Sequence, residues 1–335
     1  MIRRIALLLS CLAVALPLLG QTTLNGAGAT FPYPMYSKWF NEYNKLHPDV
    51  QINYQSIGSG GGIRQVLNGT VDFGASDGPM TDEQLSQAKV KILHIPTVLG
   101  AVVPAYNVPG VTGEIKFTPE VLASIFLGKI TNWNDPAIAK ANPGINFPSQ
   151  PIIVIHRSDG SGTTYIFTDY LSKVSSEWAN SVKKGTTVSW PLGLGGKGNE
   201  GVAGQIRQLQ GSIGYVELIY AVQNNIPYGS MKNAAGTFVK ATLEGVTEAA
   251  ASVKSMPADF RVSITNAPGK TAYPISSFTW LLIPVQAKEA NKGKILSDFL
   301  TWMVTDGQKM TTQLTYAPLP ENVAEKVKAA IQQVH

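Results

Sequence analysis

The sequence RSDGSGT at residues 157–163 follows an apolar, strand-like run and leads directly into a helical pattern. Two turns of the same kind precede it, GAGATF at 26–31 and GSGGG at 58–62. At such a junction the first N–H groups of the helix have no intrahelical acceptor, and the helix dipole makes that end attractive to anions. One junction is common, but three that carry hydroxyls, one of them also an arginine, predict a cage for a tetrahedral oxyanion.

The composition is that of an ordered globular protein with room for two domains. Of its 335 residues, 44% are hydrophobic and only 15% are charged, and no low-complexity run interrupts them. Arg3 and Arg4 supply part of the formal net charge of +5, and the other lysines and arginines are scattered. A nucleic-acid-binding surface needs a concentrated basic patch, so the charge pattern does not favour one.

The N-terminus has the pattern of an export signal. Basic residues at positions 3 and 4 precede an apolar run over 5–19 that is too short for a comfortable transmembrane helix, and polar residues follow. We expect a signal peptide over residues 1–20 and a mature protein outside the cytoplasm. Lipid attachment at Cys11 is the alternative, because LLSC at 8–11 resembles a lipobox. Cleavage near residue 20 leaves a mature protein without cysteine. Disulfides, a catalytic thiol and a thiolate-bound metal are then excluded.

Strand-like and helix-like segments alternate along the first part of the mature chain. Aromatic residues recur at i, i+3, i+4 and i+7 over 36–43, which predicts a helix that buries one face against a sheet. Strands are expected over 50–54 and 71–75, and Thr81 with Gln84 forms a capping box for a further helix. This alternation predicts a mostly parallel α/β sheet.

Two apolar stretches, 95–106 and 275–285, have the pattern of strands that cross between lobes. A self-sufficient α/β block lies between them, and the tail after Val285 is helical, with Ile295, Phe299, Leu300 and Met303 on one face. We expect this tail to return to the first lobe. Two lobes joined by two strands form a cleft, which is a common place for a small ligand.

The three turns offer many hydrogen-bond donors to an oxyanion. A four-oxygen anion taken out of water needs several aligned donors, and glycine turns let the backbone approach it closely. Arg157 adds a planar fork that can bind two oxygens at once. Each hydroxyl residue alone has the alternative role of a helix N-cap, but their repetition at three junctions favours ligand contacts. The donors are the hydroxyls of Thr30, Ser59, Ser161 and Thr163 and the N–H groups near Phe31 and Gly162.

Two aspartates accompany these donors. Asp159, two residues after Arg157, either forms an Asx-turn or orients the guanidinium and offsets part of its charge. Asp77 ends a buried strand in an otherwise anion-seeking site, which makes sense when the ligand carries a proton for the carboxylate to accept. Phosphate is protonated near neutral pH and sulfate is not, so Asp77 predicts selection for phosphate. A turn or cap role is the alternative for Asp77.

Catalytic motifs are incomplete in this chain. GLGGKG at 193–198 lacks the Ser or Thr that must follow a P-loop lysine, and the 26–31 turn lacks the third glycine of a dinucleotide fingerprint. His156, Asp159 and Ser161 cluster locally, but Ser161 is not in a nucleophile elbow. The histidines have no metal-site spacing, so we expect neither a metal nor another cofactor.

Several segments together resemble the periplasmic phosphate-binding proteins of bacterial high-affinity phosphate ABC importers. They span nearly the whole mature chain: 26–32, 72–77, 127–130, 159–163, 193–199, 214–217 and 316–320. The resemblance implies a type II periplasmic-binding-protein fold, α/β, with two mixed domains joined by two hinge strands and the ligand in the cleft. We expect lobe 1 over 21–98 and 278–335 and lobe 2 over 99–277.

The resemblance also implies the function and its residues. Phosphate contacts carry over onto Thr30, Phe31 (main chain), Ser59, Asp77, Arg157, Ser161, Gly162 and Thr163, and Asp159 matches the residue that pairs with the site arginine. It implies a monomeric, non-enzymatic receptor in the periplasm that delivers inorganic phosphate to two permease subunits with their ATPase, without nucleic acid. The alternatives are a secreted phosphoester hydrolase and a binder of another oxyanion, such as sulfate or molybdate.

Overall fold

The computed structural model describes residues 21–335, so the predicted signal peptide and Cys11 lie outside the described residues. The strands are β1 Thr22–Gly28, β2 Val50–Ser56, β3 Phe73–Ser76, β4 Ile92–Asn107, β5 Lys116–Phe117, β6 Ile153–Arg157, β7 Leu194–Gly196, β8 Ser212–Glu217, β9 Ser230–Lys232, β10 Phe238–Val239 and β11 Ser276–Pro284. The helices are α1 Tyr33–Leu46, α2 Ser59–Asn68, α3 Asp82–Ser86, α4 Pro119–Phe126, α5 Pro136–Ala141, α6 Gly162–Val174, α7 Ser176–Ser181, α8 Gly198–Gln208, α9 Leu218–Gln223, α10 Leu243–Ala251, α11 Ala290–Met303, the 3-10 helix η1 Gly307–Leu314 and α12 Glu321–Ile331.

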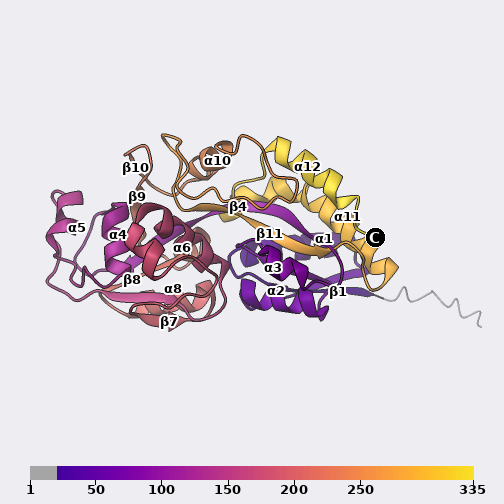
Figure 1. Cartoon of the computed structure of the whole chain (residues 1–335), viewed down its shortest axis with the longest axis horizontal. Coiled ribbons are helices and arrows are strands. Elements are labelled where there is room, and N and C mark those ends of the chain that lie inside the picture. The colour runs from indigo at the N-terminus through magenta and orange to yellow at the C-terminus, as the bar shows by residue number, and fades with distance from the viewer. Residues whose placement is uncertain (1–20) are drawn as a thin grey trace, which may run out of the picture.

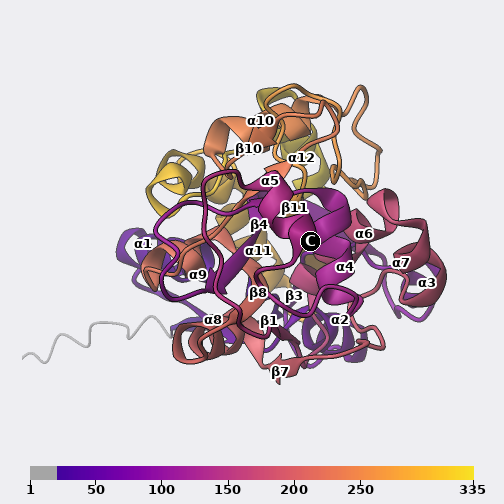
Figure 2. The same cartoon turned by 90° about the vertical axis from the view of Figure 1, so that its left-hand side faces the viewer.

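The molecule is elongated and has two lobes (Figure 1). One lobe carries α1, α2, α3, α11 and β1, and the other carries α4, α5, α6, α8 and β7. Figure 2 looks along the long axis with α4 and α5 of the second lobe nearest the viewer. The eight-stranded sheet has the order β2-β1-β3-β11-β4-β8-β6-β7, so each end of the sheet belongs to one lobe.

The long strand β4 connects the lobes. Its first part, from Ile92 to Ala101, pairs with β11, and its second part, from Val102 to Asn107, pairs with β8. β11 begins at Ser276, where the pairing partner of β4 changes. These two strands coincide with the predicted crossovers over 95–106 and 275–285, and α10 packs on both of them (Figure 1).

The two crossover strands pair antiparallel with their neighbours. The sequence predicted a mostly parallel sheet and did not identify these antiparallel pairs. β1, β2 and β3 are parallel to one another, and so are β6, β7 and β8. β11 is antiparallel to both β3 and β4, and β4 is antiparallel to β8. The physical reason is that one strand carries the chain out of the first lobe and the other brings it back.

The core of the first lobe forms around the aromatic face of α1. Tyr36, Trp39, Phe40 and Tyr43 are all buried, as the helical spacing predicts. Phe299 of α11 packs against Phe40 and Tyr43, with ring centroids 5.5 and 5.2 Å apart, and the Trp39 indole donates to Gly307 O at 2.8 Å. The C-terminal tail therefore returns to the first lobe, and the expectation is confirmed.

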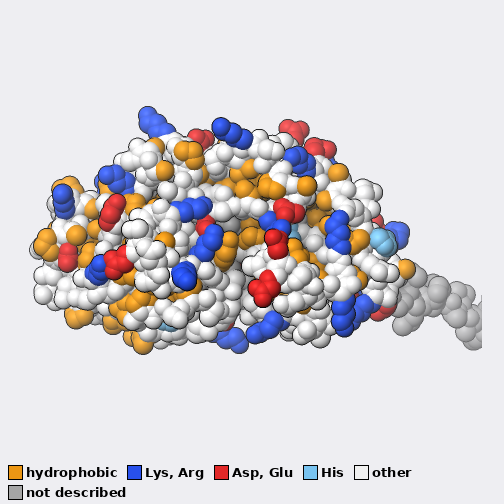
Figure 3. All heavy atoms as spheres, in the orientation of Figure 1, with side chains coloured by type: hydrophobic (Ala, Val, Ile, Leu, Met, Phe, Trp, Pro, Cys, Tyr) orange, Lys and Arg blue, Asp and Glu red, His pale blue; other side chains and the backbone are white. Residues whose placement is uncertain are grey.

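On the face shown in Figure 3, basic and acidic side chains are intermingled and no basic block gathers. Within residues 21–335, no helix has both the length and the apolar character needed to cross a membrane.

Candidate functional site

The three glycine-rich turns meet between the lobes. Thr30 and Phe31 lie in the turn between β1 and α1, Ser59 begins α2, and Asp77 follows β3. From the second lobe, Arg157 ends β6 and Gly162 begins α6. Within each lobe, the carboxyl ends of neighbouring parallel strands share one edge of the sheet. The parallel strands of the two lobes run in opposite directions, because the pairing from β3 through β11 and β4 to β8 is antiparallel, so these edges face one another. The Gly60 N–H donates to Gly160 O at 2.9 Å, which joins a first-lobe turn to a second-lobe turn.

The polar side chains of this cluster are withdrawn from solvent. Their exposed fractions are 3% or less for Thr30, Ser59, Asp77, Arg157, Ser161 and Thr163. Buried polar and charged groups need hydrogen-bond partners, so such a concentration is costly unless the groups serve one another or a ligand.

Each site hydroxyl accepts a hydrogen bond from the protein. Ser161 Oγ accepts from the Thr164 N–H at 3.0 Å, and Ser59 Oγ accepts from the Asp77 N–H at 3.2 Å. Thr163 Oγ1 accepts from Arg157 Nη1 at 3.2 Å. An accepting hydroxyl keeps its hydrogen for another acceptor, so Ser161 and Thr163 can still donate. The Ser59 hydroxyl donates to Asp77 Oδ2 at 3.4 Å.

Among Ser59, Ser161 and Thr163, the alternative role of a helix N-cap applies to one residue only. Ser161 is the N-cap of α6. Ser59 is already inside α2, whose N-cap is Gly58, and Thr163 is the second residue of α6. Because α6 begins at Gly162, the N–H groups of Gly162 and Thr163 have no intrahelical acceptor and point outward from the helix end.

Asp77 holds the buried carboxyl of the cluster. Its Oδ1 accepts from Thr279 Oγ1 at 2.8 Å, and its Oδ2 lies 3.4 Å from Ser59 Oγ. Burial raises the pKa of Asp77 to about 7, although hydrogen bonds from Thr279 and Ser59 and the charge of Arg157 act in the opposite direction. The carboxyl therefore changes between a hydrogen-bond donor and an acceptor near neutral pH.

Asp159 pairs with Arg157 in a two-pronged ion pair. Arg157 Nε donates to Oδ1 at 2.8 Å, and Nη2 lies 2.6 Å from Oδ2. Burial acts to raise the pKa of Asp159, but hydrogen bonds and charge from Arg157 outweigh it and hold the pKa below its usual value. Asp159 thus orients the guanidinium, and Nη1 remains directed toward Thr163.

The glycines of the turns are required where the lobes touch. A Cβ on Gly162 would lie 2.5 Å from both Asp77 Oδ2 and Ser59 Oγ. A side chain on Gly58, whose φ is +86°, would overlap Asp159 Oδ2. These glycines therefore allow the close approach of the two lobes around the cluster.

Sequence reasoning missed two residues that hold the site groups. Thr279, on β11, donates to Asp77 across 202 positions of sequence. Asn199 follows the strand β7 and lies in the first turn of α8, where it contacts both Thr30 and Thr163. The 193–199 segment is thus a fourth strand–turn–helix junction. It has the glycine-rich turn of the other three junctions, and this shared pattern is the signal that could have identified Asn199.

The main chain at 30–31 is fixed by two tyrosines. Tyr220 donates to Thr30 O at 2.6 Å and Tyr316 donates to Phe31 O at 2.6 Å. The His156 ring stacks on Trp190 with centroids 4.9 Å apart, and its Nδ1 lies 3.0 Å from Arg157 O. Within residues 21–335, no group of three or more His, Cys, Asp or Glu side chains is placed to hold a metal ion.

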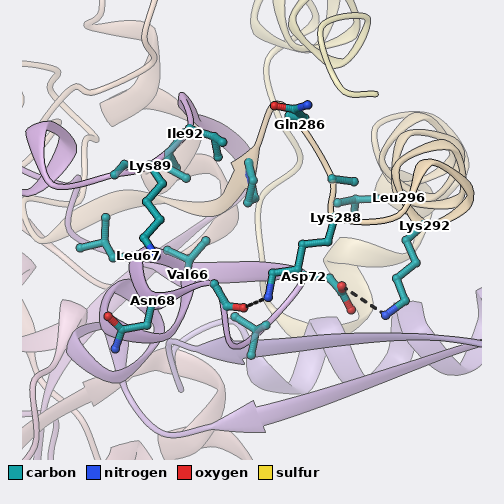
Figure 4. Close-up of a pocket in the computed structure, with 16 residues that line it drawn as sticks. Val66, Leu67, Asn68, Asp72, Lys89, Ile92, Gln286, Lys288, Lys292 and Leu296 are labelled. Atoms are coloured by element: carbon teal, nitrogen blue, oxygen red, sulfur yellow. Dashed lines mark hydrogen bonds and ion pairs between the residues drawn. The ribbon is translucent and has the colours of Figure 1, made fainter.

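A separate hollow of about 250 Å³ lies at the other end of α2 and β3 (Figure 4). Its lining is largely apolar, and two of its lysines already contact protein oxygens. Lys288 donates to Gly69 O, and Lys292 Nζ lies 3.5 Å from Asp72 Oδ1. This hollow has none of the converging hydroxyl and helix-end donors of the site between the lobes.

Comparison with known proteins shows close relatives. Residues 17–307 match the family profile described as "PBP superfamily domain". The chain is 47% identical over 327 residues to the phosphate-binding protein PstS of Pasteurella multocida, covering 97% of this chain and 94% of the relative. It is also 47% identical to the phosphate-binding protein PstS of Xylella fastidiosa strain Temecula1, covering 91% of this chain and 84% of that one.

A solved structure has the same fold. It is described as a high affinity periplasmic phosphate-binding protein bound with phosphate, and it superimposes with a TM-score of 0.76 at 23% identity. The match covers 92% of this chain and 93% of that structure. The two-lobed α/β fold expected from the sequence is therefore confirmed.

Proposed function

The chain belongs to the PBP superfamily and, within it, to the PstS phosphate-binding proteins, and from this membership we propose that it captures inorganic phosphate between its lobes. It serves as the substrate-binding protein of a phosphate ABC importer. The proposed contacts are Thr30, Phe31 (main chain), Ser59, Asp77, Arg157, Ser161, Gly162 and Thr163, with Asp159 behind Arg157.

One observation carries this proposal: buried donors from both lobes surround the buried carboxyl of Asp77. Hydroxyls, helix-end N–H groups and a guanidinium supply donors to oxyanion oxygens. The Asp77 carboxylate supplies an acceptor, which suits an anion that still carries a hydroxyl. Phosphate provides both kinds of oxygen at neutral pH, and sulfate provides only acceptors.

We propose that binding closes the lobes. The first-lobe residue Ser59 and the second-lobe residue Gly162 face one another across the site, so one ligand can contact both sides. A ligand that contacts both lobes stabilises the closed form by its higher affinity for that form. We place the domain boundaries of this proposal at 98/99, within β4, and at 277/278, within β11, the two strands about which the lobes would move.

We further propose that the mature protein is a periplasmic monomer without catalytic activity. It then hands phosphate to two permease subunits and their ATPase. A secreted phosphoester hydrolase is the alternative function, but the site lacks an activated nucleophile, since His156 faces Trp190 and the Arg157 carbonyl.

Titration calorimetry with phosphate and sulfate, side by side, tests the proposed function. We expect tight phosphate binding with one site per chain and much weaker binding of sulfate. Solution scattering on the same samples should show a smaller radius of gyration with phosphate. Equal affinity for both anions, no binding of either, or turnover of a chromogenic phosphoester would contradict the proposal.

A further inference from the structure

Asn199 occupies the contact between the lobes. It is fully buried in the first turn of α8, and its neighbours include one hydroxyl from each lobe. Those hydroxyls belong to Thr30 of the first lobe and Thr163 of the second. Asn199 itself is not among the proposed phosphate contacts.

The orientation of the Asn199 amide is set by a backbone group. The Glu217 N–H donates to Asn199 Oδ1 at 2.9 Å, and an N–H cannot accept a hydrogen bond. The oxygen of the amide therefore faces Glu217, and the NH₂ group faces the two threonines. Nδ2 lies 2.8 Å from Thr30 Oγ1 and 3.0 Å from Thr163 Oγ1, so each of its two hydrogens has one acceptor.

These contacts fill the acceptor capacity of both hydroxyls. A hydroxyl oxygen accepts at most two hydrogen bonds and donates one. Thr30 Oγ1 accepts from Asn199 Nδ2 and also from the Asn199 backbone N–H at 3.2 Å. Thr163 Oγ1 accepts from Asn199 Nδ2 and from Arg157 Nη1 at 3.2 Å. Only the hydroxyl hydrogen of each threonine is then left for another partner.

We propose that Asn199 is a positioning residue that makes Thr30 and Thr163 obligate donors to the bound phosphate. This inference rests on the proposed function. It explains how two neutral, rotatable hydroxyls become specific for unprotonated oxygens, one from each lobe. The single phosphate hydroxyl is then directed to Asp77, the acceptor of the cluster. Because Asn199 reaches Thr30 only across the cleft, the arrangement is completed when the lobes close.

The test is a double-mutant cycle on phosphate affinity by titration calorimetry. Asn199→Ala removes both side-chain donors, and we expect phosphate to bind about tenfold to a hundredfold more weakly. Thr163→Val removes one of the hydroxyls that Asn199 orients. In the Thr163→Val background the loss caused by Asn199→Ala should be several-fold smaller, because only Thr30 is left to orient. A loss of equal size in both backgrounds would overturn the inference.

A matched control separates positioning from folding. Asn142 is also a buried asparagine of the second lobe, with hydrogen bonds to Lys116 and Ile138. Asn142→Ala should lower the phosphate-free melting temperature and leave the phosphate dissociation constant unchanged within about twofold. If Asn199→Ala behaves like Asn142→Ala, Asn199 is only structural and the inference is wrong. If the wild-type chain fails to bind phosphate, the proposed function itself fails, which is a distinct result.

Discussion

The replacement Asp77→Asn tests the discrimination between phosphate and sulfate. Asp77 Oδ1 accepts from Thr279 Oγ1 at 2.8 Å, which fixes one side of the carboxyl. An asparagine that keeps this bond with its oxygen places its NH₂ group at the position of Oδ2. The group that faces the ligand changes from an acceptor to a donor, while the size of the side chain is unchanged.

The magnitude follows from the hydrogen bond that sulfate cannot make. A buried polar group left without its partner costs about 1–3 kcal/mol, and more when it is charged. An amide donor would remove this penalty for sulfate, so we expect sulfate to bind Asp77→Asn roughly 5- to 150-fold more tightly than it binds the wild type. Phosphate can turn an unprotonated oxygen toward the amide, so its affinity should fall by less than about tenfold.

Titration calorimetry at pH 8 with each anion measures both changes. At this pH the wild-type Asp77 is largely a carboxylate, because its pKa is raised only to about 7. Thr279→Val is the control, since it removes a partner of Asp77 but leaves the acceptor in place. A ratio of sulfate to phosphate affinity that is the same in Asp77→Asn and the wild type would show that Asp77 does not exclude sulfate.

Three further predictions concern pH, lobe contact and the ion pair. Since the pKa of Asp77 is raised to about 7, its carboxyl donates a hydrogen bond below that pH and accepts one above it. The affinity of the wild type for sulfate should therefore fall about tenfold per pH unit above 7. The affinity of Asp77→Asn for sulfate should not depend on pH. Gly162→Ala puts a Cβ 2.5 Å from Asp77 Oδ2 and Ser59 Oγ, so phosphate affinity should fall about tenfold to a hundredfold with little change in phosphate-free stability. Gly204→Ala is the control, since Gly204 lies in α8 with open space around it. It should stabilise the folded protein by about 1 kcal/mol and leave phosphate affinity unchanged. Asp159→Asn leaves buried Arg157 without its anion, so the phosphate-free unfolding free energy measured by urea titration should fall by about 3 kcal/mol. Asp306→Asn, the control, breaks an exposed ion pair with Lys309 and should change the unfolding free energy by less than about 1 kcal/mol. Wild-type unfolding energies for Asp159→Asn, or full affinity for Gly162→Ala, would contradict these predictions.

Local patterns predicted the secondary structure well where one face of an element is buried. The aromatic spacing over 36–43 predicted the buried face of α1, and the capping box of Thr81 and Gln84 is present in α3. The long apolar runs identified β4 and β11 as the strands that cross between lobes. The direction in which these strands pair was not predictable, because it depends on which distant strand lies beside each one.

The chemical character of the site was predictable from local sequence patterns. Strand–turn–helix junctions rich in glycine and hydroxyls specify outward-pointing donors, since each junction is built from neighbouring residues. The order of these junctions along the chain also indicated that the donors come from two lobes.

The pKa of Asp77 and the hydrogen-bond partners of the site residues depend on the folded arrangement of the chain. The raised pKa of Asp77 arises first from burial, which requires both lobes to enclose the carboxyl. Asn199 and Thr30 are 169 positions apart, and Asp77 and Thr279 are 202 positions apart. Hydrogen bonds over such separations form only when folding brings the partners together, so no local pattern in the chain encodes them.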